Sequence, residues 1–325
     1  MRIFALPMLM LLFVSAAAVA IEEADYPHPV IAFTFDSQQQ TLAMKYMDVQ
    51  PEGKSKGVVM LLHGKNFTGA YWHQTIDFLV GEGYRVVVPD QVGFGLSTLP
   101  EHYQFTFAQL AANSKALLEH LDIDKVTVMG HSMGGMLATR FALQYPDDVR
   151  QLLLLNPIGL EDWRAMGVPY VSIDKLYNSE RNKNFGDIKI YQQASYYDSR
   201  WNNDYARWAQ LLADSYQGDQ GDRFAWNMAL TSDMVMSQPV VYEFDQLKVP
   251  TTLLIGTRDR TAIGRNLVDD ETAQKMGDYT QLGKTAAKRI PDAHLIEFDD
   301  VGHLPHIEAP ERYLKALKTA LNHAQ

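Results

Sequence analysis

The chain has 325 residues, no cysteine, 46% hydrophobic residues and a formal net charge of −10 at pH 7. This length is sufficient for one large core with an inserted subdomain. The lack of cysteine excludes a disulfide framework and a lipid anchor on a cysteine, and the acidic balance disfavours nucleic acid and anionic membranes as partners.

Residues 1–20 have the composition of a secretory signal peptide. A positive start at Arg2 precedes an almost wholly apolar stretch from Ile3 to Val14, and Ala18-Val19-Ala20 fits an A-x-A cleavage site. The apolar stretch is too short to span a membrane comfortably, although an uncleaved N-terminal anchor is the alternative. We therefore expect an exported protein, periplasmic or secreted, with no stable membrane insertion after cleavage.

The next segments have the periodicity of strands and helices. Val30–Phe35 and Thr41–Val49 alternate in the manner of an antiparallel hairpin at a sheet edge. Phe107–Leu121 has helical spacing with Thr106 as its N-cap, and Ser132–Tyr145 indicates a second helix. Short apolar runs predict the remaining strands at Val58–Leu62, Tyr84–Asp90, Val126–Met129, Gln151–Asn156, Val249–Gly256 and Ala293–Phe298.

The composition changes between residues 157 and 240, where four of the five tryptophans lie. Apolar positions at 201, 205, 208, 211 and 212 have helical spacing. We expect a mainly helical cap at 157–240, inserted into a core formed by 21–156 and 241–325. Most of its aromatic side chains are expected to pack within the cap itself, but their number also favours an apolar or aromatic acyl pocket.

The most informative motif is Gly130-His131-Ser132-Met133-Gly134, directly after a predicted strand. A G-x-S-x-G sequence between a strand and a helix is typical of a sharp turn that exposes a strained serine as a nucleophile. Glycine is required on both sides because a side chain would collide with the neighbouring strand and helix. A lone motif of this kind can also be an ordinary turn, so Ser132 needs partners elsewhere in the chain.

Two later loops supply those partners. A serine nucleophile needs a base, and the base needs an acid that holds its tautomer. Asp259 follows the strand predicted at Val249–Gly256, and His303 follows the strand predicted at Ala293–Phe298, so the chain order is Ser, Asp, His. Asp299 and Asp300 are nearer to His303 in sequence, but topology favours Asp259 because it lies at a neighbouring strand end.

An oxyanion site is expected where the strand Val58–Leu62 ends in His63-Gly64-Lys65. The backbone N–H of Lys65 and that of Met133 would converge on the developing oxyanion. We expect His63 and His131 to be structural, and Arg258 and Arg260 to be exposed to solvent.

Together, these residues resemble the α/β-hydrolase superfamily, in the branch with a cap between core strands six and seven. The resemblance runs from about His63 to the C-terminal helix and includes Gly302-His303-Leu304-Pro305 and the D-x-x-G-x-G-x-S loop from Asp90 to Ser97. That loop is expected to be a tight turn rather than a phosphate cradle, because it lacks G-x-G-x-x-G spacing. The resemblance implies a mostly parallel eight-stranded sheet flanked by helices.

By position, the resemblance assigns Ser132 as nucleophile, Asp259 as acid and His303 as base. It implies hydrolysis of a small-molecule carboxylic ester. We expect no metal or organic cofactor, because no His, Asp and Glu residues are grouped with the spacing of metal ligands. Serine-dependent carbon–carbon hydrolases of ring-cleavage products share the same residues and are the alternative; a binding protein without chemistry is a third. Haloalkane dehalogenases and epoxide hydrolases need a carboxylate nucleophile, and position 132 is serine.

Overall fold

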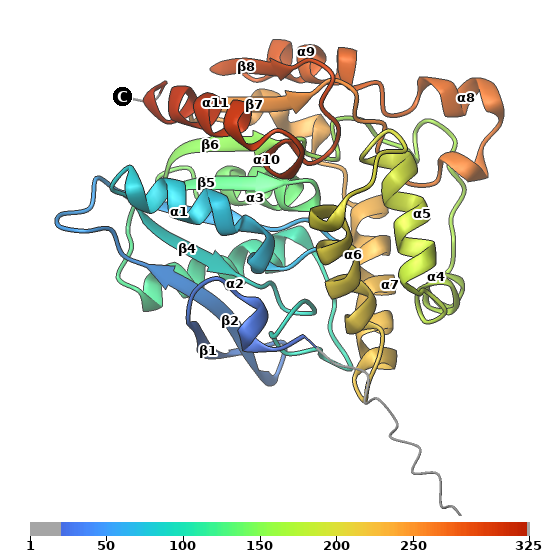
Figure 1. Cartoon of the computed structure of the whole chain (residues 1–325), viewed down its shortest axis with the longest axis horizontal. Helices are drawn as coiled ribbons and strands as arrows, with labels where there is room; N and C mark the ends of the chain where they lie inside the picture. Colours follow the sequence, from blue (N-terminus) through green and yellow to red (C-terminus); the bar gives the residue numbers. More distant parts are fainter. Residues whose placement is uncertain (1–20, 324–325) are drawn as a thin grey trace, which may run out of the picture.

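The computed structural model describes residues 21–323, so the predicted signal peptide at 1–20 lies outside the described residues. Eight strands form one sheet in the order β1-β2-β4-β3-β5-β6-β7-β8 (Figure 1). The first two pairings, β1 with β2 and β2 with β4, are antiparallel, and all others are parallel. The strands are β1 (Val30–Ser37), β2 (Gln40–Val49), β3 (Val58–Leu62), β4 (Arg85–Pro89), β5 (Val126–His131), β6 (Val149–Leu155), β7 (Thr251–Gly256) and β8 (Ala293–Phe298). The predicted hairpin and the predicted mostly parallel sheet are both confirmed.

The central strands are buried on both faces, which explains their continuous apolar sequences. Successive side chains of a strand point to opposite sides of the sheet. In β6, Leu152 and Leu154 belong to the core on one face, whereas Leu153 and Leu155 belong to the core on the other. A parallel sheet covered by helices on both sides requires this pattern.

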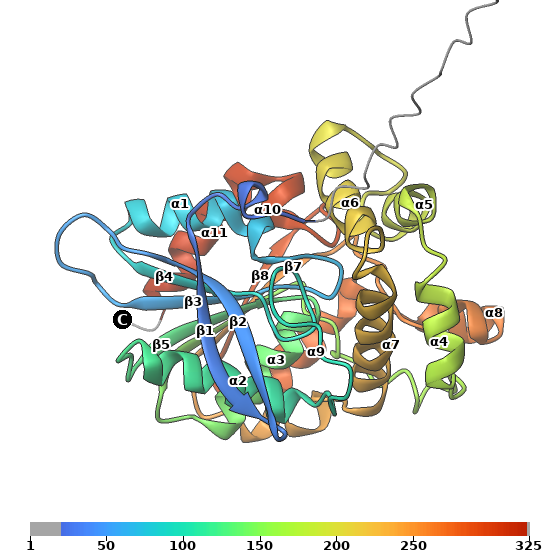
Figure 2. The same cartoon turned by 90° about the horizontal axis from the view of Figure 1, so that it is seen from below.

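Two layers of helices cover the sheet. Figure 2 shows α1 and α11 on one side of it and α2, α3 and α9 on the other. In α11 the residues Tyr313, Ala316, Leu317, Ala320 and Leu321 are buried, a spacing that places one face of the helix on the core. The helices of these layers and the C-terminal connections are α1 (His73–Gly81), α2 (Phe107–His120), α3 (Met133–Gln144), α8 (Asp270–Lys275), α9 (Tyr279–Arg289), α10 (Pro305–Glu308) and α11 (Pro310–Asn322).

Four further helices lie between β6 and β7, and together we call them the helical insertion: α4 (Ile173–Glu180), α5 (Phe185–Ser195), α6 (Asn203–Ser215) and α7 (Gly221–Ser237). They stand beyond the carboxyl ends of the parallel strands (Figures 1 and 2). Side-chain oxygens of Ser172, Asn184 and Asn202 cap α4, α5 and α6 by accepting backbone N–H groups. No helix within residues 21–323 combines the length and the apolar character needed to cross a membrane.

Candidate active site

Ser132 lies at the turn between β5 and α3. Its φ of 56° and ψ of −121° place it in a strained region of backbone space. A Cβ at Gly130 would lie 2.0 Å from the Gly134 carbonyl oxygen, and one at Gly134 would lie 2.2 Å from that of Leu62. The turn therefore forms only when both flanking positions are glycine, as the G-x-S-x-G motif predicts.

His303 and Asp259 form a buried pair. His303 Nδ1 lies 2.5 Å from Asp259 Oδ2, and both side chains are 0% exposed. Because a carboxylate only accepts hydrogen bonds, Nδ1 carries the proton and Nε2 presents its lone pair. Asp300, a nearer candidate in sequence, has a side chain that is 71% exposed and pairs with Arg200 and Arg258 instead. Asp259, which the order of the strands favoured over Asp300, is the carboxylate that contacts His303.

The nitrogen that would act on Ser132 is uncommitted. His303 Nε2 is buried and makes no hydrogen bond with any residue from 21 to 323, so Ser132 Oγ and His303 Nε2 are not bonded to each other here. The ring of His131, the residue before Ser132, lies 4.8 Å from the His303 ring. A hydrogen bond between a catalytic serine and its histidine commonly forms or shortens only when substrate is bound.

Asn156 completes the environment of Asp259, and sequence analysis missed it. Its Nδ2 donates to Asp259 Oδ2 at 3.0 Å, and the Gly256 backbone N–H donates to its Oδ1 at 2.8 Å. The Thr261 backbone N–H donates to Asp259 Oδ1 at 2.8 Å. Asn156 has a φ of 35° at the end of β6. An amide directly after a buried leucine run was the available signal.

His131 links the loops that surround the site. Its Nε2 lies 2.8 Å from the His303 carbonyl oxygen, and its Nδ1 lies 3.0 Å from the Tyr71 hydroxyl. That hydroxyl accepts the Gly64 N–H at 3.0 Å, so it must donate its own proton to His131 Nδ1. Burial lowers the pKa of His131 well below its ordinary value. As predicted, His131 is structural: it is a neutral connector between the loops of Gly64 and His303.

Lys65 reaches across the site to the helical insertion. Its Nζ lies 3.2 Å from Glu180 Oε1, and Glu180 also binds Lys183 Nζ at 2.6 Å and the Tyr216 hydroxyl at 2.5 Å. Burial alone would raise the pKa of Glu180, but the two lysine charges and these hydrogen bonds outweigh it and lower the pKa to about 2. Glu180 is therefore an ionised carboxylate between the loop after β3 and helix α4.

The prediction that Arg258 is exposed to solvent is wrong. Its side chain is only 17% exposed, because the guanidinium donates to Glu308 and, at 3.1 Å, to the Asp300 carbonyl oxygen. Glu308 in turn accepts the Gly302 N–H at 2.8 Å. Through these contacts Arg258 and Glu308 fix the position of the loop that carries His303. Arg260 is half-exposed and lies 3.7 Å from Asp278, as expected of a solvated residue.

The loop from Asp90 to Ser97 is a tight turn, as expected. Asp90 is buried and accepts the Gly69 N–H at 2.7 Å, the Leu96 N–H at 3.1 Å and the Tyr26 hydroxyl. A Cβ at Gly95, where φ is +51°, would lie 2.0 Å from the Asp90 carboxylate. The carboxylate therefore fills the space that a phosphate cradle would need.

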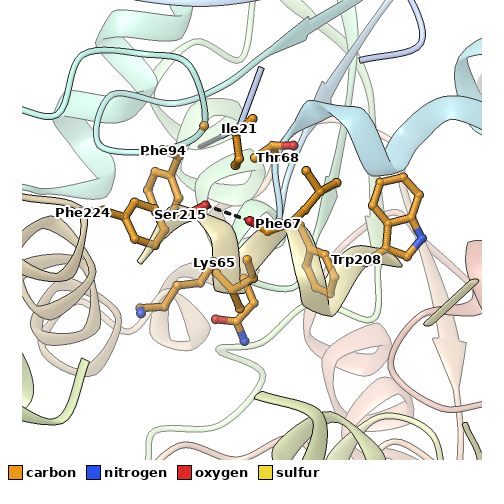
Figure 3. Close-up of a pocket in the computed structure, with 12 residues that line it drawn as sticks. Ile21, Lys65, Phe67, Thr68, Phe94, Trp208, Ser215 and Phe224 are labelled. Atoms are coloured by element: carbon orange, nitrogen blue, oxygen red, sulfur yellow. Dashed lines mark hydrogen bonds between the residues drawn. The ribbon is translucent and has the colours of Figure 1, made fainter. Parts of the chain in front are cut away.

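A cavity of about 1330 Å³ opens beside Ser132. The loop after β3, the helical insertion and residues 260–267 line it, and the side chains include Lys65, Ile158, Leu176, Tyr196 and Ile263. A second pocket of about 10 Å³ lies between α6 and the loop of Lys65, bordered by Phe67, Phe94, Trp208 and Phe224 (Figure 3). It is large enough for about one water molecule, so of these two pockets the larger is the one that can hold a substrate.

Comparisons with known proteins agree with this architecture. The family model described as alpha/beta hydrolase fold matches residues 57–310. The structure of a protein described as a probable hydrolytic enzyme of Pseudomonas aeruginosa PAO1 is similar, with 51% sequence identity, a TM-score of 0.90 and coverage of 91% of this chain and 95% of that one.

Relatives whose names state an activity are less similar in sequence. Cis-3-alkyl-4-alkyloxetan-2-one decarboxylases of Xanthomonas campestris and Shewanella oneidensis are 35% and 24% identical, over 35% and 82% of this chain and 40% and 82% of their own lengths. A 2-hydroxy-6-oxo-2,4-heptadienoate hydrolase of Pseudomonas putida is 32% identical over 31% of this chain and 38% of that enzyme. On the fold, the site geometry and the extent of the family match, this chain belongs to the alpha/beta hydrolase family.

Proposed function

We propose that the chain is an exported serine hydrolase that cleaves carboxylic esters of small apolar or aromatic substrates through an acyl-enzyme. One observation carries the proposal: the strained serine Ser132 lies beside a large cavity, and His303, whose ring contacts that of His131, has one nitrogen bound to a buried carboxylate and the other without a hydrogen bond among residues 21–323. This is the arrangement that acyl transfer to serine requires.

In the proposed mechanism, Ser132 Oγ attacks the ester carbonyl while His303 Nε2 takes its proton. Asp259 stabilises the imidazolium, and the N–H groups of Met133 and Lys65 bind the oxyanion. Met133 begins α3, so its N–H has no carbonyl partner within the helix, and the helix dipole favours negative charge there. His303 then protonates the leaving alcohol, and a water molecule attacks the acyl-enzyme in the same way. Each lost oxyanion donor typically costs roughly 2.7–4 kcal/mol of transition-state stabilisation.

The lining of the cavity supports an apolar substrate. Aliphatic and aromatic side chains such as Ile158, Leu176, Ile188, Tyr191 and Met236 face it from the helical insertion and the adjoining loop. Rings and branched aliphatic groups bind apolar acyl groups with little loss of conformational entropy. A volume of about 1330 Å³ accommodates an aryl or medium-length acyl group together with its alcohol.

A Ser132→Ala variant tests the proposal. We expect it to lose turnover of p-nitrophenyl esters and labelling by a fluorophosphonate while its circular dichroism and melting temperature stay close to those of the wild type. Ser55→Ala makes the same chemical change in the loop between β2 and β3 and should retain both activities. Ester hydrolysis by Ser132→Ala at the wild-type rate would refute the assignment.

Carbon–carbon bond hydrolysis is the second candidate, since the partial match to the Pseudomonas putida enzyme favours it. The same serine, histidine and carboxylate serve both reactions. A vinylogous diketone and a matched aryl ester, assayed side by side, separate the two. A larger kcat/KM on the diketone would replace the ester proposal. Failure of a fluorophosphonate to label Ser132, together with no turnover of either substrate, would favour a binding protein.

A further inference from the structure

Tyr196, at the end of α5 in the helical insertion, lies directly against the histidine. Its ring stacks on the imidazole of His303 with 4.5 Å between ring centroids and 25° between planes. Its carbonyl oxygen accepts the His303 backbone N–H at 3.4 Å. A Cβ at Gly302 would lie 1.9 Å from that same oxygen, so the histidine loop is pressed against Tyr196. The residue is only 4% exposed.

The hydroxyl of Tyr196 reaches the other side of the site. It accepts a hydrogen bond from Asn66 Nδ2 at 2.9 Å. Asn66 follows Lys65, whose backbone N–H is the proposed oxyanion donor, and both residues line the large cavity with Ser132. One side chain of the helical insertion therefore touches the loop of the base and the loop of the oxyanion donor.

The stacked Tyr196 ring also stabilises positive charge on His303. When His303 takes the serine proton it becomes an imidazolium, and the face of an aromatic ring attracts a cation, most strongly where water is excluded. Among residues 21–323, Asp259, His131 and His306 are the titratable groups, besides Tyr196, that contact His303 or interact with its charge. Tyr191 packs on Tyr196 and interacts with Asp259. Burial lowers the pKa of His131 and of His306 well below their ordinary values, so both stay neutral. The imidazolium thus depends on Asp259 and on the tyrosine ring.

We propose that Tyr196 is a positioning residue of the hydrolytic site: its ring orients His303 and stabilises the imidazolium, and its hydroxyl holds the oxyanion loop through Asn66. This inference rests on the proposed function. It makes the helical insertion part of the catalytic apparatus in addition to a wall of the cavity.

The ring and the hydroxyl are tested separately. Tyr196→Phe keeps the stacked ring, whereas Tyr196→Leu keeps an apolar side chain that excludes water but removes the aromatic face. Tyr197→Leu is the matched control, because Tyr197 is also buried and has no ring contact to His303 among the described residues. Its ring stacks on Tyr205 with 3.7 Å between centroids and meets the Tyr196 ring edge-on at 6.2 Å. The rate constant of fluorophosphonate labelling, measured against pH, reports the apparent pKa of the base without any choice of substrate.

We expect the apparent pKa of the labelling reaction in Tyr196→Leu to fall by about half to one unit, since the imidazolium loses its aromatic neighbour. Tyr196→Phe and Tyr197→Leu should keep the wild-type value, whatever they do to the melting temperature. A Tyr196→Leu profile that coincides with the wild type, or an equal shift in Tyr197→Leu, overturns the role of the ring.

The hydroxyl is tested by a double-mutant cycle with Asn66→Ala. We expect Tyr196→Phe and Asn66→Ala each to lower kcat on a p-nitrophenyl ester about threefold to tenfold, the range of one hydrogen bond. The hydroxyl also has a hydrogen bond with Tyr191. The double variant should therefore be no worse than Tyr196→Phe alone, because that change already removes the contact that Asn66→Ala removes. Multiplicative losses refute the coupling. Failure of the wild type itself to label or hydrolyse would instead refute the proposed function.

Discussion

Asp259 illustrates how single residues are prepared for chemistry in this molecule. Folding removes its carboxylate from water, and three hydrogen bonds, from His303, Asn156 and Thr261, replace the lost solvation. A buried charge is tolerated only when it is paired in this way. The three donors come from separate segments, so the orientation of His303 depends on all of them.

Replacement of Asp259 by asparagine tests this role at the residue scale. The amide can donate to His303 Nδ1 and so favour the tautomer with the proton on Nε2, which cannot accept the serine proton. We expect kcat on p-nitrophenyl esters to fall by about 10⁴-fold with little change in fold. Asp300→Asn, at the exposed neighbouring carboxylate, should keep wild-type activity. Retention of more than a tenth of the activity in Asp259→Asn would contradict the assignment.

The glycines of the elbow give a second prediction at this scale. Gly130→Ala places a methyl group 2.0 Å from the Gly134 carbonyl oxygen, so the backbone must shift. We expect a loss of several kcal/mol in the free energy of unfolding, about 3 kcal/mol or more, measured by urea denaturation. Gly81→Ala is the control, since its Cβ meets nothing within 4 Å. Equal stability of the two variants would show that the elbow tolerates a side chain.

At the scale of elements, helix α4 is joined to the loop after β3 by a buried ionic contact. Glu180 and Lys65 have side chains that are 7% and 11% exposed. Buried ion pairs often stabilise the folded state no more than an apolar contact of the same shape would. Removal of one partner, however, destabilises the protein because it leaves an unpaired buried charge. The contact therefore specifies where α4 sits.

We expect Glu180→Gln to lower the free energy of unfolding by about 3 kcal/mol at pH 7, because Lys65 and Lys183 lose their counter-ion. The folded-state pKa of Glu180 is about 2, below the ordinary 4.5. The stabilisation from its ionised form is thus complete above pH 4.5 and is lost as the pH falls toward 2. Denaturation measured across this range should show that loss in the wild type and not in Glu180→Gln. Glu271→Gln, at an exposed pair with Lys275, should behave like the wild type.

The limits of sequence analysis are also clearest at the scale of elements. Strands such as β6 were predictable because buried leucines follow one another on both faces of the sheet. The loops of Ser132, Asp259 and His303 were predictable because carboxyl ends of parallel strands share one edge. The contacts of Asn156 and Tyr196 were not, since their partners lie 103 and 130 residues away. The burial of Arg258 was not predictable either, because its partner Glu308 lies far away in the sequence.

At the scale of the whole molecule, the chain combines an acidic surface, no cysteine and a densely packed core on each face of one sheet. A protein without disulfides depends on such packing for its stability. The described residues begin at Ile21, which packs against the second core and borders the small pocket shown in Figure 3.

Export gives the prediction at this scale. We expect the full chain, expressed in a bacterium with a periplasm, to be recovered from the periplasm or medium with its N-terminus at Ile21, as read by N-terminal sequencing. A variant with Leu11 and Leu12 replaced by arginine, which breaks the apolar stretch, should stay in the cytoplasm at full length. Cytoplasmic retention of the unaltered chain would refute export.

The Lys65–Glu180 contact also bears on how substrates enter the cavity and products leave it. Movement of α4 away from the loop after β3 would separate the Glu180 carboxylate from the Lys65 ammonium group and leave two buried charges unpaired, which makes that movement a rare event at neutral pH. We therefore expect reactants and products to pass through the existing opening of the cavity, whose width would then limit which molecules reach Ser132.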